Sequence, residues 1–415
     1  MNKFNKSNNN NDINTDLNFD VAKKNTIYKR TKMTNFGLPL RSFYGQKPMW
    51  QVMGITIITA IIFGVISVFF VKNVGIYNFG LAAFGQSIAR LITVSMPESV
   101  ASNLRNMIDQ LVYWIAYIVL SIPIFIFGYK KIGKTFTNLT VIFLVVSSFI
   151  SFGIGLIDGA NNIYFIGDFS NKIVKNSLNE YQKSLSPIIP LLWNDGGNII
   201  ALMIYSLTYG FLLSWIFAII QIIGGTAGVT GVIGEWYANE KQKSFASISG
   251  YMNIAIILIC VAIGSYIPGS MLLKSVDKSI VHDEQVLMVL NKAWTFELYL
   301  SPNFVATVLT NFIYILVLNK LFPKFKLVRV EIFSKHYMDI SERLAHDTKI
   351  VTGVTVFKGI GGYSGKEVNV VTSIALFRQV PRIIKAIRDV DSEAFISISD
   401  IASIDGHVYL PTNKF

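Results

Sequence analysis

The sequence predicts a mostly α-helical, polytopic membrane protein with a small α+β domain at its C-terminal end. The 415-residue chain is 52% apolar and only 15% charged, whereas soluble domains carry about 25% charged residues. Uncharged apolar runs long enough to cross about 30 Å of hydrocarbon recur between residues 50 and 319. Beyond residue 324 the hydropathy falls, and short alternating patterns replace the long apolar runs.

These changes in composition divide the chain into three parts. Residues 1–45 are rich in Asn and poor in large aliphatic side chains, so we expect a disordered, basic cytoplasmic tail. Residues 46–324 are expected to form the transmembrane domain. Residues 325–415 are expected to form a cytoplasmic regulatory domain of ferredoxin-like fold.

Six apolar runs predict six transmembrane helices. A single such run could be a buried helix of a soluble protein, but six in one chain indicate membrane spans. The first run follows a 49-residue polar tail and is too long for a signal peptide, so we expect it to be retained. The predicted spans are 50–71, 111–128, 139–157, 198–223, 245–267 and 303–319.

The positive charges predict the orientation of the spans, because Lys and Arg are retained on the cytoplasmic side. The N-terminal tail has nine Lys and Arg against three Asp, whereas residues 158–197 have three Lys against four acidic residues. Further cations follow the second and the last span, at Lys130, Lys131, Lys134, Lys320, Lys324, Lys326 and Arg329. We therefore expect a multi-pass protein of the cell membrane with both termini cytoplasmic. The net charge of +12 indicates contact with anionic lipid of the bilayer and not with nucleic acid.

Metal, cofactor and catalytic chemistry are not expected. The single cysteine, Cys260, excludes an intrachain disulfide and a cysteine-based metal site, and the four histidines lack ligand spacing. The spans contain no Ser/His/Asp set and no paired carboxylates. The sequence therefore does not indicate an enzyme.

Two glycine-bearing segments suggest that the membrane part is duplicated. Residues 74–91 and 222–237 each follow the first span of a group of three and are too broken for clean spans. Two units with an odd number of spans lie in the bilayer in opposite senses, as in many transporters built from inverted repeats. The two segments are then expected to be re-entrant, approaching the midplane without crossing the bilayer.

Such segments could line a small polar cavity with backbone and hydroxyl groups. An arginine in the first segment would be costly in lipid unless it faced protein or water. The alternative is that the glycines only allow close helix packing and that the arginine lies in a packing interface. The candidate cavity residues are Gly224, Gly225, Thr226, Gly228, Thr230 and Arg90.

The C-terminal domain follows a β-α-β-β-α-β order, which is that of a ferredoxin-like fold. Asp339 is expected to cap the first helix, since Glu342 follows three residues later. Pro381 lies in the first turn of the second helix, where its missing amide is tolerated. The expected strands are 326–333, 350–357, 367–376 and 394–401, and the helices are 339–346 and 380–387.

A glycine-rich loop connects the second and third expected strands. It exposes backbone amides, a hydroxyl and two ammonium groups, which suit an anion or a phosphate. The spacing is not that of a P-loop, and the alternative is a hairpin whose glycines adopt positive φ. The candidate ligand-binding residues are Lys358, Gly359, Gly361, Gly362, Tyr363, Ser364, Gly365 and Lys366.

The segments GVTVFKGIGGYSGKE, from residue 353, and VPRIIKAIRDVDSEAFISISDI, from residue 380, resemble the YitT family of bacterial membrane proteins. Weaker likeness lies in SIPIFIFGYKKIGKTF and GGTAGVTGVIG, so the resemblance covers about residues 50–410. It implies a C-terminal domain related to trimeric PII-like domains, which bind nucleotides through a loop between strands. It also implies a homo-oligomer, with a trimer as one option, and places the sensing loop at Gly361–Lys366. The chain has Gly231 where the family commonly has an acidic residue.

The leading functional expectation is a small-solute transporter or permease regulated by its cytoplasmic domain. The alternative is a membrane-anchored receptor or scaffold that transports nothing and whose C-terminal domain binds a nucleotide-like ligand.

Overall fold

The structure, a computed structural model, describes two compact units that divide between Phe325 and Lys326. The N-terminal tail up to residue 38 and the loop residues Tyr363 and Ser364 lie outside the described residues. The description covers residues 39–405 except 45–46, 98, 158, 170–184, 186–187, 277–283, 348–352 and 363–364.

The first unit is a helical bundle with six helices long and apolar enough to cross a membrane, which confirms the six predicted spans. Two of the spans contain a stretch of π-helix, a widening that often occurs at functional positions. The spans are α1 (Met49–Ile66) continued by η2 (Ser67–Lys72), α3 (Ser102–Lys131), α4 (Lys134–Gly155), α7 (Gly197–Ile222), α9 (Phe245–Val261) continued by η5 (Ala262–Tyr266) and α10 (Ile267–Lys274), and α13 (Pro302–Leu321).

Shorter helices lie between the spans. α2 (Leu81–Ser95) and α8 (Thr230–Lys241) have 15 and 12 residues, which at about 1.5 Å per residue is too short to cross the hydrocarbon. The other short elements in the described part of this unit are η1 (Arg41–Phe43), η3 (Ala160–Asn162), α11 (Glu284–Leu290) and α12 (Phe296–Tyr299).

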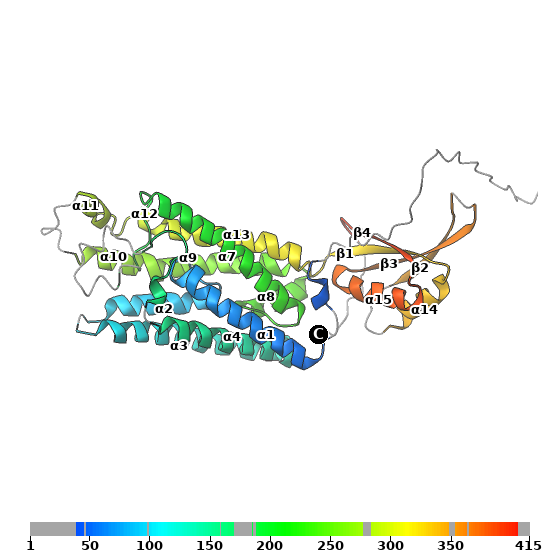
Figure 1. Cartoon of the computed structure of the whole chain (residues 1–415), viewed down its shortest axis with the longest axis horizontal. Helices are drawn as coiled ribbons and strands as arrows, with labels where there is room; N and C mark the ends of the chain where they lie inside the picture. The colour runs from blue at the N-terminus through cyan, green and yellow to red at the C-terminus, as the bar shows by residue number, and fades with distance from the viewer. Residues whose placement is uncertain are drawn as a thin grey trace, which may run out of the picture. The chain divides into compact units, whose positions relative to one another are not determined.

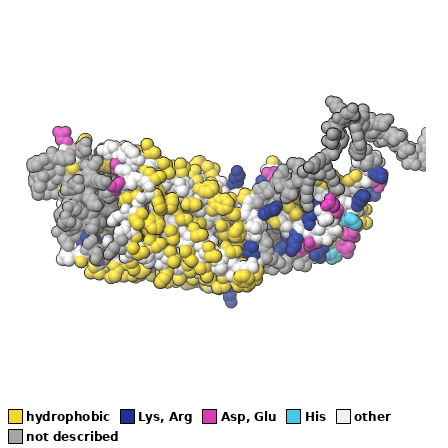
Figure 2. All heavy atoms as spheres, in the orientation of Figure 1, with side chains coloured by type: hydrophobic (Ala, Val, Ile, Leu, Met, Phe, Trp, Pro, Cys, Tyr) yellow, Lys and Arg dark blue, Asp and Glu magenta, His cyan; other side chains and the backbone are white. Residues whose placement is uncertain are grey.

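The outer surface of the bundle is apolar over a broad area (Figure 2). Large side chains on four different spans are half or more exposed, including Ile58 at 60%, Ile115 at 57%, Phe149 at 75% and Ile200 at 66%. Exposure of such a broad apolar surface to water is unfavourable, whereas contact with lipid chains is favourable. Together with the six spans, it identifies a multi-pass membrane protein.

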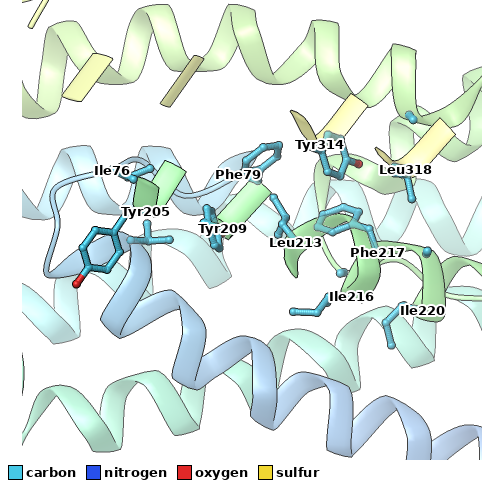
Figure 3. Close-up of a cluster of buried hydrophobic side chains, with 14 of the residues drawn as sticks. Ile76, Phe79, Tyr205, Tyr209, Leu213, Ile216, Phe217, Ile220, Tyr314 and Leu318 are labelled. Carbon is cyan, nitrogen blue, oxygen red and sulfur yellow. The ribbon is translucent and has the colours of Figure 1, made fainter. Parts of the chain in front are cut away.

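Aromatic side chains fill the centre of the bundle (Figure 3). The ring of Phe79 lies 4.9 Å from that of Tyr314 and 6.4 Å from that of Phe217. Gly210 allows α7 and α13 to approach closely here. A Cβ at this position would lie only 2.8 Å from the Thr310 carbonyl oxygen. The non-helical chain before α2 is thus held at the middle of two spans.

The second unit has the predicted β-α-β-β-α-β order. Its sheet is antiparallel with strand order β2-β3-β1-β4, which is the ferredoxin-like arrangement. Figure 1 shows α14 and α15 on one side of this sheet. The elements are β1 (Leu327–Phe333), α14 (Tyr337–His346), β2 (Val354–Ile360), β3 (Glu367–Leu376), η7 (Phe377–Gln379), α15 (Val380–Val390) and β4 (Phe395–Asp400).

Alternation along the strands builds the core of this domain. Val328, Val330 and Ile332 of β1 are fully buried and share a face with their partners on β3. The two helices add Ile340, Leu344, Ile383 and Ile387 to this core.

The predicted cap of the first helix in this domain is wrong. α14 begins at Tyr337 with His336 as N-cap, so Asp339 lies inside the first turn. Its carboxylate lies 3.6 Å from His336 Nδ1. Asp339 therefore complements the helix dipole instead of capping the helix. Pro381 lies in the first turn of α15, as expected.

Candidate functional site

The two short helices of the membrane unit begin at the same place. Gly80 is the N-cap of α2, and Thr230 is the first residue of α8. A Cβ at Gly80 would collide with Thr230 Oγ1 and would lie 3.2 Å from Thr230 Cβ. Although 150 residues separate them in the chain, the two helix starts are therefore in direct contact.

From this contact the two helices run to opposite ends of the bundle (Figure 1). α8 leads to the start of α9, where Asn319, near the end of α13, donates to Ser247 Oγ. α2 leads to the other end, where Thr93 donates to Asp109 in the second turn of α3. Each half of the bundle thus contains a span, a return to the middle, a short helix and two further spans. This is the order expected for an inverted repeat.

A hydrogen-bonded network fixes the chain before α2. Asn78 Oδ1 accepts from the Phe79 amide at 2.9 Å and from the Tyr209 hydroxyl at 3.2 Å. Asn78 Nδ2 donates to the Tyr113 hydroxyl at 3.3 Å. Gln86 accepts from the Asn78 amide and donates to the Ile76 carbonyl. Sequence reasoning missed these residues, although an Asn and a Gln in an apolar segment were a visible signal.

The predicted glycines before α8 are closely packed. A Cβ at Gly225 would lie 3.2 Å from Leu139 Cβ, and one at Gly228 would lie 3.1 Å from the Phe217 ring. Gly224 adopts φ +97°, which favours glycine. The Thr226 amide donates to Thr140 Oγ1 at 3.2 Å. Among the described residues, these contacts match the packing alternative for the glycines.

The resemblance to the YitT family predicts an acidic residue at position 231, where this chain has a glycine. A Cβ at this position would collide with Thr226 Oγ1. The present fold of the segment therefore has no space for a carboxylate side chain at residue 231.

Arg90 lies apart from the predicted glycines, about two and a half turns along α2 from its start. The side chain is only 9% exposed. Its Nη1 donates to Ser265 Oγ at 3.2 Å and to the Tyr77 hydroxyl at 3.4 Å. The guanidinium carbon also lies 5.2 Å from the centre of the Tyr77 ring. The structure thus separates the predicted cavity residues into a glycine group and an arginine group.

The glycine-rich loop is a β-hairpin, as the simpler interpretation predicted. β2 and β3 pair up to Ile360 and Glu367, and the turn is closed by the Gly361 amide donating to the Lys366 carbonyl at 2.8 Å. The Gly365 amide donates to the Gly361 carbonyl, and Gly365 adopts φ +61°. Two of the amides expected to bind an anion therefore donate within the turn.

Lys358 and Gly359 belong to β2 and not to the turn. They pair with Asn369 and Val368 of β3, and Lys358 is exposed on this edge strand. Gly362 is also exposed. The turn is thus accessible to a ligand.

The fold and this arrangement define the class of the protein: a multi-pass membrane protein with an attached ferredoxin-like domain. Residues 352–406 match the family described as an uncharacterized protein conserved in bacteria, DUF2179. No solved structure matches the chain.

Several curated relatives match nearly the whole chain. Uncharacterized protein MG443 of Mycoplasma genitalium is 30% identical over 390 residues, covering 93% of this chain and 95% of the relative. The MG443 homolog of Mycoplasma pneumoniae is 29% identical over 401 residues, covering 94% and 96%. The MG432 homolog of the same species is 29% identical over 381 residues, covering 92% of each. The chain belongs to the family of MG443.

Proposed function

We propose that this protein is a transporter or permease for a small solute in the cell membrane. The observation that carries the proposal is the contact between Gly80 and Thr230, where two short helices begin head to head. Helices interrupted in the middle of a membrane present unpaired amides at their N-termini, and transporters use such ends to hold a substrate. The aromatic cluster of Phe79, Tyr209 and Tyr314 would close the passage on one side.

We also propose that the chain is a YitT-type protein with both termini in the cytoplasm. DUF2179 domains are found at the C-terminus of YitT-family proteins, and the positive-inside bias supports the orientation. On this proposal the protein carries no catalytic site of its own.

The C-terminal domain would regulate transport by binding a small anionic or nucleotide ligand at the β2–β3 turn. A buried ion pair could couple ligand binding in this domain to the helical bundle. Lys324, just before the domain, pairs with Glu235 of α8, and the two side chains are only 3% and 2% exposed. The chain segment that leads to the domain is therefore anchored to one of the two short helices.

A homo-oligomer is also part of the proposal. The edge strands of the sheet carry exposed apolar side chains, with Phe357 at 57%, Ile360 at 68% and Phe395 at 66%. Exposed edges of this kind favour contact with another chain. A trimer is the arrangement that the PII-like resemblance suggests.

A receptor or scaffold without transport is the second candidate. It is favoured by the close packing of Gly225 and Gly228, because glycines that serve packing need no solute. Solute flux into proteoliposomes containing the full chain separates the two functions. Transport predicts flux above that of protein-free vesicles. An absence of flux, together with ligand binding by the C-terminal domain, would favour the receptor.

A further inference from the structure

Three charged side chains lie together at the end of the bundle where α2 ends. Lys72 ends η2, Arg90 lies on α2, and Asp109 lies on α3. Lys72 Nζ lies 3.6 Å from Asp109 Oδ2, and Thr93, three residues after Arg90 on α2, also contacts this carboxylate. The cluster therefore contains two cations and one carboxylate, and its formal charge is positive.

Among the described residues, the carboxylate of Asp109 forms no ion pair with Arg90, and both of its oxygens have other partners. Asp109 Oδ1 accepts from Thr93 Oγ1 at 3.2 Å, and its other oxygen faces Lys72. The described contacts of Arg90 are with the neutral hydroxyls of Tyr77 and Ser265, and it forms no ion pair within the described part of the chain. Among the residues that the structure describes, this guanidinium, which is nine-tenths buried, thus has no anionic partner.

An unbalanced buried cation is costly, and inside membrane proteins such residues mark substrate and ion paths. A guanidinium presents several donors in a plane, which suits carboxylate, phosphate and similar oxyanions. The two π-helical stretches supply further parts of the cluster, since Lys72 belongs to η2 and Ser265 to η5. Two π-helical stretches that contribute to one cluster indicate a binding site rather than a simple packing contact.

The helix starts at the middle of the bundle have the same electrostatic preference. The N-terminal ends of α2 and α8 both carry partial positive charge, and they meet where Gly80 contacts Thr230. An anion that passed Arg90 would therefore next encounter a second favourable position. A cation would be repelled at both.

From these observations we propose that the transported solute is a small anion and that Arg90, with Lys72, forms the site that selects it. This inference rests on the proposed transport function and adds the charge class of the solute. The shared chemistry is a compact negative group, such as an inorganic oxyanion, a halide or a small carboxylate.

The test uses the full chain in proteoliposomes and measures efflux of labelled chloride, phosphate, acetate, rubidium and glycerol. We expect efflux of at least one of the three anions to exceed that of protein-free vesicles, with rubidium and glycerol at background. Arg90→Gln and Lys72→Gln are expected to reduce anion efflux at limiting concentration about tenfold, the usual effect of losing a charged hydrogen bond. Arg90→Lys, which keeps the charge, is expected to retain more efflux than Arg90→Gln.

Lys292→Gln is the matched control, because Lys292 pairs with Glu297 outside this cluster and is about one-third exposed. It should leave efflux unchanged.

Efflux of rubidium or glycerol without anion efflux would overturn the anion inference and leave transport standing. Absence of efflux for every probe would overturn both. Anion efflux that is unchanged in a folded Arg90→Gln protein would show that Arg90 only packs α2 against η5. If Arg90→Gln does not fold, the wild-type selectivity and Lys72→Gln still decide the inference.

Discussion

Gly80 and Thr230 touch across the centre of the membrane unit, and only a residue without a Cβ fits at the first of these positions. Gly80 also adopts φ +62° with ψ −139°, a backbone region that is essentially restricted to glycine. The contact therefore requires glycine at residue 80 for two reasons: a side chain would not fit, and other residues rarely adopt this backbone conformation.

We predict that Gly80→Ala destabilises the bundle. The backbone strain alone costs on the order of 1–3 kcal/mol, and the collision with Thr230 adds to it. Thermal unfolding in detergent should show a clearly lower midpoint. Gly153→Ala is the matched control, since a Cβ at Gly153 in α4 meets nothing within 4 Å. Equal midpoints for the two variants would contradict the described contact.

The buried pair of Lys324 and Glu235 gives a second prediction. Glu235→Gln leaves the Lys324 ammonium group buried without its carboxylate, and breaking a buried ion pair usually costs about 3–5 kcal/mol. We expect a lower thermal midpoint in detergent, which adding Lys324→Met to Glu235→Gln should partly restore, because the buried ammonium group is then removed as well. Glu297→Gln removes a partly exposed carboxylate from another lysine pair and should change the stability by less than about 1 kcal/mol. A Glu235→Gln protein as stable as the Glu297→Gln protein would show that the pair anchors nothing.

Ligand binding at the β2–β3 turn gives a third prediction. Calorimetry of the full chain with nucleotides, including cyclic dinucleotides, should show binding that Lys366→Ala weakens through the lost charge. Gly362→Val should weaken it by crowding the exposed turn. Lys385→Ala changes an exposed lysine on α15, away from the turn, and should have no effect. If the turn variants bind as tightly as the control, the turn is only a connection.

Asp391 gives a prediction for acid stability. The Ser334 hydroxyl and the Glu393 amide both donate to its carboxylate, and these bonds lower the pKa of Asp391. A carboxylate with a lowered folded pKa stabilises the fold at neutral pH, and this stabilisation is lost as the pH falls through that pKa.

The unfolding of the C-terminal domain, followed in the full chain by hydrogen exchange, should therefore lose stability below about pH 4. Asp391→Asn should reduce this dependence, whereas Asp389→Asn, which changes an exposed neighbour on α15, should retain it. The same pH profile in both variants would rule out the contribution of Asp391.

Local pattern was enough to predict the elements but not their contacts. Apolar run length determines whether a helix can cross the membrane, so all six spans were predictable. Alternation along β1 and β3 likewise predicted a sheet in the second unit. The contact of Gly80 with Thr230 could not be predicted from the sequence. The two residues lie in different halves of the membrane part, and the sequences of these halves have low identity to each other.

The polar contacts inside the bundle were hidden for a related reason. Tyr113 and Tyr209 look like ordinary apolar-run residues, and only the folded chain brings both hydroxyls to Asn78. Arg90 was recognised as costly, but its partner Ser265 depends on a π-helical stretch that leaves no hydropathy signal. The predicted cap at Asp339 was wrong because α14 begins three residues earlier than the capping pattern indicates, with His336 as its N-cap.

The account depends on solute passing the contact between the two short helices, and flux through variants of Thr230 tests this most directly. Thr230→Val keeps the shape of the side chain and removes the hydroxyl beside Gly80. Thr56→Val is its matched control, because the Thr56 hydroxyl donates to the carbonyl of Val52 within α1. The account predicts flux in wild-type proteoliposomes that falls markedly in Thr230→Val and persists in Thr56→Val. Equal flux in all three proteins, or none in any of them, would contradict it.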